Sequence, residues 1–297
     1  MTSATAAPAA SATSPARSTT AAVRTHKRKT PWVGLAAWVL GVFFVAPAVW
    51  MVWLSFHSES DAAANPPKFT APLTVEGYRD FFGSGSASPW PALFNSLAAS
   101  VVSTLIVLLL AFPAAYALSI RPVKKWTDVM FFFLSTKMLP AVAGLLPIYL
   151  IARNLHMLDN VWLLILIYAS MNLPIAVWMM RSFLAEVPTE MLEAAAIDGA
   201  GLPTIMVRII APVALPGIAA TSLICFIFSW NELLFAKVLT AVVAQTAPVF
   251  LTGFITSQGL FLAKVCAAAT IISVPVLAAG FAAQDKLVQG LSLGAVK

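Results

Sequence analysis

Few side chains in this sequence are able to do chemistry, and several of them interrupt long apolar runs. Lys137 stands in "STKMLPAVAG" with apolar residues on both sides. A charged side chain inside a bilayer is costly, so Lys137 is expected to face a bundle interior or a wet path. The alternative is that Lys137 snorkels to the cytosolic headgroups, because it lies only about ten residues into its expected span. With its polar neighbours it forms a set of candidate translocation-path residues: Thr136, Lys137, Ser170, Asn172, Asn231 and Glu232.

The other members of this set also allow two interpretations. Asn231 and Glu232 follow an apolar run, so they either line the outer end of a path or cap the helix. Asn172 lies in the uncharged run 161–180, close to Pro174, and a proline there frees a backbone carbonyl. The hydroxyls of Ser170 and Thr136 suit neutral substrates, although such groups usually bond to their own helix.

Metal chemistry and hydrolysis are not expected. The three histidines, His26, His57 and His156, fall outside the apolar runs. Cys225 and Cys266 lie within such runs, without metal-ligand spacing, and read as small buried hydrophobes. A glycine-rich phosphate loop ending in Lys and Ser/Thr is missing from the sequence, so we expect no ATP site, no cofactor and no enzymatic activity in this chain.

A second polar stretch, "EAAAIDGAG" at residues 193–201, sits between two apolar runs. Pro188 suits a first helical position, and Gly199 is a natural stop. Leu192, Ala195, Ala196 and Gly199 recur at helical spacing and give one face of small residues. A small face permits close approach, either to the chain's own bundle and the headgroups or to another protein. The sequence pattern does not decide between these two interpretations.

The elements that carry these residues are predicted to be membrane-spanning helices. Hydrophobic residues make up 60% of the chain and charged residues only 10%, against about 25% charged residues in soluble domains. A helix of about 20 apolar residues crosses a bilayer, and strand-like alternation is absent. We therefore predict an all-α membrane protein whose six spans cover residues 32–56, 93–120, 127–152, 160–181, 211–235 and 265–283. Residues 238–264 are expected to form an external loop with short interfacial pieces.

The ends of these spans predict the orientation. Residues 1–30 are rich in Ala, Ser, Thr and Pro and are expected to be a disordered tail. With six spans, twelve Lys and Arg residues fall on the side of both termini, and five on the other. Basic residues mark the cytoplasmic side, so both termini and the 186–210 loop are expected in the cytosol. The scattered basic residues do not form a nucleic-acid surface.

The polar loop also resembles a known family. "EAAAIDGAGLPTIMVRIIAP" is similar to the EAA loop of ABC importer permeases, and the match places Glu193, Ala194, Ala195, Gly199, Ile209 and Pro212 on the motif. Asp198 lies beside them, and Ala211 stands where leucine is usual. The resemblance implies a MetI-like permease fold in which this loop is a coupling helix that binds a cytosolic ATPase.

The resemblance also implies which subunits assemble with this chain. Members of the family work with a second permease subunit, a cytosolic ABC ATPase dimer that binds the ATP, and an extracytoplasmic substrate-binding protein, in the bacterial cytoplasmic membrane. "WNELLF" at 230–235 and the tail at 287–297 resemble the maltose-type carbohydrate permeases. "STKMLPAVAGLLPIYLI", "MNLPIAVWM", "ALPGIA" and "GLFLAKVCAAAT" resemble mannitol and sorbitol permeases most.

The resemblance implies import of a linear polyol, with a mono- or disaccharide as the alternative substrate. An ion-coupled secondary transporter is a competing class, but it would need paired intramembrane acids or an inverted repeat, and neither is evident. A membrane assembly factor would need no coupling loop.

Overall fold

The computed structural model describes residues 31–65, 68, 70–83, 88–120, 123–256 and 259–294. The expected tail at 1–30 lies outside these residues. The chain divides into two units, Met1–Pro47 and Ala48–Lys297, so the boundary falls inside helix α1 (Pro31–Leu54). The helix is apolar on every side and contains Pro47, as suits a helix surrounded by lipid.

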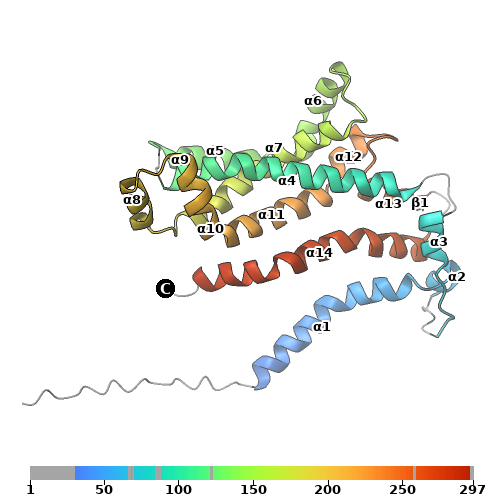
Figure 1. Cartoon of the computed structure of the whole chain (residues 1–297). Helices are drawn as coiled ribbons and strands as arrows, with labels where there is room; N and C mark the ends of the chain where they lie inside the picture. The colour runs from blue at the N-terminus through green and yellow to red at the C-terminus, as the bar shows by residue number, and fades with distance from the viewer. Residues whose placement is uncertain are drawn as a thin grey trace, which may run out of the picture. The chain divides into compact units, whose positions relative to one another are not determined.

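Three long helices form the centre of the second unit: α4 (Pro89–Ser119), α7 (Val161–Leu184) and α11 (Leu215–Trp230). They pack on one another, and α14 (Leu262–Gly294) packs on α11 and on α3 (Glu76–Gly83) (Figure 1). Small residues such as Ala111, Ala176 and Gly217 are buried where these helices meet. Small side chains let helix backbones approach closely within a membrane, where there is no hydrophobic force between helices.

Within the part of the chain that the structure describes, four helices are long and apolar enough to span a bilayer, and the number rises to six if each of two bent helix pairs counts as one span. The first pair corrects the expected continuous span over 127–152. Helix α5 (Trp126–Met138) and helix α6 (Ala141–Asn154) meet at 86°. Pro140 lies in the break and holds Leu139 in an extended conformation, because a residue before proline avoids the helical region.

The second bent pair replaces the expected span over 211–235. A short helix α9 (Leu202–Thr204), a π-helix η1 (Ile205–Ile210) and α10 (Ala211–Val213) run into α11 at 81°. Pro216 opens α11 and has no N–H to donate to Pro212, so the helical hydrogen-bond ladder is interrupted there. Helix α11 ends at Trp230 instead of continuing to residue 235.

The segment expected to be an external loop contains short elements. They are α12 (Leu234–Leu239), α13 (Ala247–Thr252) and a hairpin of β1 (Ile255–Thr256) and β2 (Gly259–Leu260). Among the described residues of this segment there is no helix long enough to span. Helix α8 (Thr189–Ile197) and α9 lie at one end of the central helices, while α12, α13, α3 and α2 (Glu59–Ala62) lie at the other (Figure 1).

Candidate functional site

Helix α8 carries the EAA-like residues and ends in a defined cap. Its C-cap is Asp198, and Gly199 follows with φ +75°. The Gly199 N–H donates to the Ala196 carbonyl at 3.1 Å, and the Ala200 N–H donates to the Ala195 carbonyl at 3.0 Å. This pair of bonds is the Schellman motif, which favours glycine at the left-handed position. A Cβ on Gly199 would meet nothing within 4 Å, so Gly199 is required for its backbone conformation and not for close packing.

The two faces of α8 differ in burial. Ala195 is 6% exposed and belongs to the main hydrophobic cluster, against which Leu192 also packs. On the other face Ile197 is 86% exposed, and Glu193 is exposed as well. The small-residue face expected to dock is therefore split, because Leu192 and Ala195 contact the chain's own bundle while Ala196 and Gly199 are exposed. The surface open to a partner includes Glu193, Ala194, Ile197 and Asp198.

The remaining motif residues, Ile209 and Pro212, follow α8 in η1 and α10. Ile209, in η1, packs partly buried against the same hydrophobic cluster, next to the fully buried Ile210. Pro212 is exposed at the start of the bend into α11.

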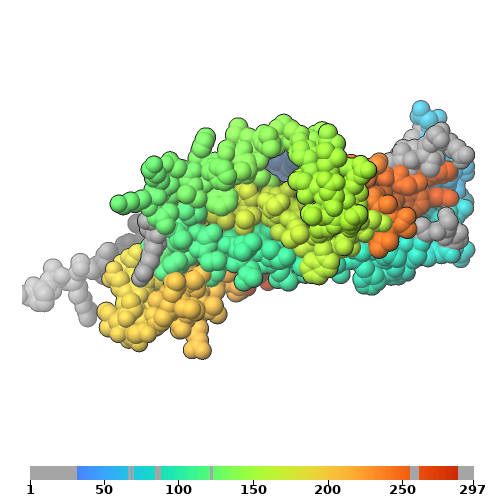
Figure 2. Space-filling model, turned by 90° about the horizontal axis from the view of Figure 1, so that it is seen from above, coloured from blue at the N-terminus to red at the C-terminus, as the bar shows by residue number. Residues whose placement is uncertain are grey.

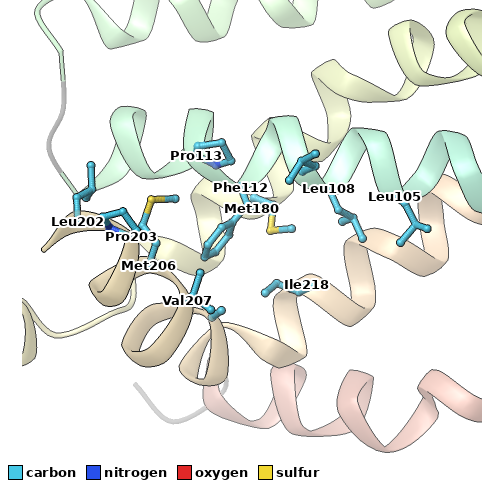
Figure 3. Close-up of a pocket in the computed structure, with 12 residues that line it drawn as sticks. Leu105, Leu108, Phe112, Pro113, Met180, Leu202, Pro203, Met206, Val207 and Ile218 are labelled. Carbon is cyan, nitrogen blue, oxygen red and sulfur yellow. The ribbon is translucent and has the colours of Figure 1, made fainter.

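An apolar groove of about 560 Å³ opens beside this bend. In Figure 3, Leu202, Pro203 and Met206 lie across from Phe112 and Pro113 of α4. Its lining contains no charged residue, as suits a surface facing lipid or another apolar helix.

Asn172 ties the central helices together. Its Nδ2 donates to Ser229 Oγ at 2.9 Å, and Ser229 Oγ lies 3.1 Å from Ser103 Oγ. The three residues come from α7, α11 and α4, and all are buried. Buried hydrogen bonds of this kind hold membrane helices in register. Asn172 is therefore placed inside the bundle and not on an open surface.

Lys137 reaches across to α7. Its Nζ donates to the Met171 carbonyl at 2.7 Å. Met171 is the eleventh residue of the 24-residue helix α7, so this carbonyl lies about 15–20 Å from either end of the helix. The ammonium group therefore lies level with the middle of α7, away from both ends of this candidate span. Lys137 stays a candidate residue of the translocation path.

The hydroxyl groups of Thr136 and Ser170 donate hydrogen bonds within their own helices. Thr136 Oγ1 donates to the Phe133 carbonyl and Ser170 Oγ to the Ile167 carbonyl, both at 2.7 Å. These are bonds to the preceding turn of the same helix, the usual arrangement for such residues in membrane helices.

Asn231 and Glu232 act at helix ends. Asn231 Nδ2 donates to the Ile227 carbonyl at 2.9 Å, which satisfies the end of α11. The Glu232 carboxylate accepts the N–H groups of Phe235 at 2.9 Å and Ala236 at 3.1 Å. A carboxylate at this position caps the N-terminus of α12. The capping interpretation accounts for both residues.

Sequence reasoning missed Asp159, which organises the loop at the opposite end from α8. Its carboxylate accepts four backbone N–H groups, from Ala241, Val242, Val243 and Ala244, at 2.8–3.1 Å. Burial raises the pKa of Asp159, but these four bonds outweigh it and bring the pKa down to about 2. Asp159 itself has φ 56°, which aspartate tolerates better than most residues. The partners lie about 80 positions away, so no local pattern signals the contact.

Comparison with known proteins identifies the family of this chain. Residues 81–292 match the model of the binding-protein-dependent transport system inner membrane component. The chain is 38% identical over 259 residues to a probable ABC transporter permease, y4oR, of Sinorhizobium fredii, covering 87% of this chain and 92% of that protein.

Two further relatives carry substrate names. The diacetylchitobiose uptake permease DasC of Streptomyces coelicolor is 32% identical, with 90% of this chain and 96% of DasC covered. The trehalose permease SugB of Mycobacterium tuberculosis is 31% identical, with 91% and 98% covered.

The fold has a solved counterpart. A chain of a bacterial ABC transporter involved in the import of the acidic polysaccharide alginate matches with a TM-score of 0.70 at 22% identity. The match covers 88% of this chain and 99% of that one, which shows the same fold. The chain thus belongs to the binding-protein-dependent inner-membrane components, the multi-pass and non-catalytic permease subunits of ABC transporters.

Proposed function

We propose that this chain is the membrane path of an ATP-driven importer for a carbohydrate of disaccharide size. The observation that carries the proposal is the match, over about nine-tenths of the chain, to permeases named for diacetylchitobiose and trehalose uptake. A third relative, from Thermococcus litoralis, is named for trehalose and maltose and is 28% identical. All three names describe neutral sugars.

The exposed face of α8 is the proposed contact with a cytosolic ATPase. Glu193, Ala194 and Asp198 present polar and small side chains around the exposed Ile197. Gly199 fixes the end of the helix, while Ala195 and Ile209 pack in the hydrophobic cluster of the bundle and Pro212 is exposed at the bend into α11. A short helix seated on its own core moves as a rigid body, so it can pass on the closure of a partner.

The rest of the assembly follows from the family. We propose a second permease subunit, an ATPase dimer that binds the ATP, and an external binding protein that delivers the sugar. Membrane lipid surrounds the exposed apolar helix surfaces, such as those of α1 and α4.

A linear polyol is the second candidate. The stretches that resemble mannitol and sorbitol permeases favour it. The disaccharide has the stronger support, because three relatives are named for the disaccharides diacetylchitobiose, trehalose and maltose, and one other is named for sulfoquinovosyl glycerol.

Uptake by a deletion strain tests the proposal. Labelled trehalose, maltose, diacetylchitobiose, mannitol and sorbitol are supplied to cells without this gene, and to cells complemented with the wild type or with Glu193→Lys. We expect uptake of one disaccharide to require the wild-type gene and to fail with the variant. Loss of polyol uptake alone would favour the polyol, and normal uptake of every compound after deletion would refute a carbohydrate importer.

A further inference from the structure

Among the residues that the structure describes, no acid forms an ion pair with the ammonium group of Lys137, which lies level with the middle of α7. The described residues form two ion pairs, Lys68–Asp61 and Lys264–Asp80, and Lys137 belongs to neither. One of its three N–H groups donates to the Met171 carbonyl at 2.7 Å. The side chain is exposed, so the other two N–H groups are open to a ligand.

Two features hold this ammonium group in place. Lys137 is the penultimate residue of α5, which ends at Met138 directly before the 86° break at Leu139 and Pro140. The residue after Met171 is Asn172, whose bonds to Ser229 Oγ and the Cys225 carbonyl fix α7 against α11. The carbonyl that binds Lys137 is therefore next to a residue that is hydrogen-bonded to α11.

An opening lies beside the two helices that meet just after Lys137. Figure 2 shows this opening in the surface, bordered by the green and yellow-green segments that hold α5 and α6. A cation without an ion-pair partner costs free energy when it faces lipid within a membrane span. We therefore expect Lys137 to lie beside a water-filled path. An ammonium group there is only weakly screened and attracts anionic groups that enter the path.

We propose that Lys137 contacts the saccharide in transit and makes the path favour saccharides that carry a carboxylate over those that carry an ammonium group. A carboxylate receives charge-assisted hydrogen bonds from the two open N–H groups, and a sugar hydroxyl receives weaker neutral ones. An amino sugar in its charged form is repelled. This inference rests on the proposed function, since it assigns a substrate preference to the same path.

The first test is whether water reaches this position. The Lys137→Cys variant of the assembled transporter is treated with a water-soluble, membrane-impermeant thiol reagent, with the wild type as control for Cys225 and Cys266, which are both buried. Modification of the variant alone is expected. A thiol facing lipid would stay unmodified, because the reaction needs the thiolate, and that result would overturn the proposal whether or not the substrate is a sugar.

The second test measures preference. Whole transporters in proteoliposomes, with their binding protein, take up a disaccharide, its uronate and its amino derivative, in the wild type, Lys137→Met, Lys137→Arg and the control Lys124→Met. The ratio of uronate to neutral uptake is expected to fall about tenfold in Lys137→Met and to persist in Lys137→Arg and the control. The binding protein is the same throughout, so the change reports the path.

The two proposals fail in different ways. An unchanged ratio in Lys137→Met, with normal uptake of the neutral disaccharide, would refute the role of Lys137 and leave the carbohydrate importer standing. Absence of uptake of all three sugars by the wild type would refute the carbohydrate importer, while the thiol test still decides whether Lys137 lines the path.

Discussion

Gly199 and Gly217 are required for different physical reasons. Gly199 supplies a left-handed backbone at the end of α8 and leaves open space around its Cα. Gly217, in α11, is buried, and a Cβ there would collide with the ring and Cβ of Phe183 on α7. The two central helices therefore touch through a backbone-to-ring contact that admits no side chain on the α11 side.

Substitution of Gly217 tests this contact. Gly217→Ala forces Phe183 or the helix to move, and overpacking of this kind costs about 1–3 kcal/mol. We expect a lower thermal unfolding temperature of the purified transporter and partial recovery in the Gly217→Ala/Phe183→Ala double variant. Gly280→Ala is the matched control, because a Cβ there meets nothing within 4 Å. Equal unfolding temperatures for all variants would contradict the close contact.

Asp159 makes the stability of its loop depend on pH. Its pKa is depressed to about 2, against about 3.9 in an unfolded chain. A depressed carboxyl contributes stability that is present above the unfolded pKa and is lost as the pH falls from about 4 through about 2. At neutral pH, Asp159→Asn removes the charge from four hydrogen bonds, and we expect a loss of about 1–2 kcal/mol after allowance for solvent.

Hydrogen exchange is the direct measurement of this effect. The amides of residues 241–244 should exchange faster in Asp159→Asn than in the wild type, while those of α7 stay protected. Asp128→Asn, which removes an exposed acid at the opposite end of the bundle, serves as the control. Unchanged protection at residues 241–244 would mean that the carboxylate does not hold the loop.

At the scale of helices, α8 has one face for its own chain and one for a partner. Glu193→Lys and Ile197→Asp alter only the exposed face, so we expect normal amounts of protein in the membrane but loss of uptake and of ATPase co-purification. Ala195→Asp buries a charge in the hydrophobic cluster and is expected to reduce the amount of folded protein instead. Retention of the ATPase by both exposed-face variants would remove the docking role of α8.

The sequence predicts the helical elements better than their breaks. The apolar runs place α4, α7 and α14 because a 20-residue apolar stretch has few alternatives in a bilayer. Mean hydropathy does not reveal the bends at Pro140 and at Ala214, because the two helices on either side of each bend together form one apolar stretch. Proline marks both places, but Pro113 and Pro174 lie within helices that continue, so proline alone does not predict a break.

The residues of the candidate site can also be predicted only in part from the sequence. The sequence identifies α8 through its composition, and Lys137 through its isolation in an apolar run. The contacts that decide their roles join distant segments, as with Lys137 and Met171, or Asn172 and Ser229. Such pairs depend on which helices pack together, and a single sequence does not contain that information. The burial of Ala195 likewise depends on the helices that it packs against.

At the scale of the whole molecule, the two ends of the bundle should face different compartments. The end with α8 carries the basic loops, whereas the end with α12 and α13 holds the loop fixed by Asp159. The twelve-to-five distribution of Lys and Arg predicts that the α8 end and both termini are cytosolic. Single cysteines at exposed positions test this: Val123 and Ala194 for the cytosolic side, and Asn65 and Leu155 for the outer side.

An impermeant thiol reagent applied to intact cells should label Asn65→Cys and Leu155→Cys but not Val123→Cys or Ala194→Cys. All four should react once the cells are opened, which shows that each introduced thiol is accessible. Ala195 is unsuitable for this purpose, because it is buried and would escape the reagent from either side. Labelling of Ala194→Cys in intact cells would place α8 outside, where an ATPase that uses cytosolic ATP cannot reach it. The orientation and the coupling role of α8 would then fall together.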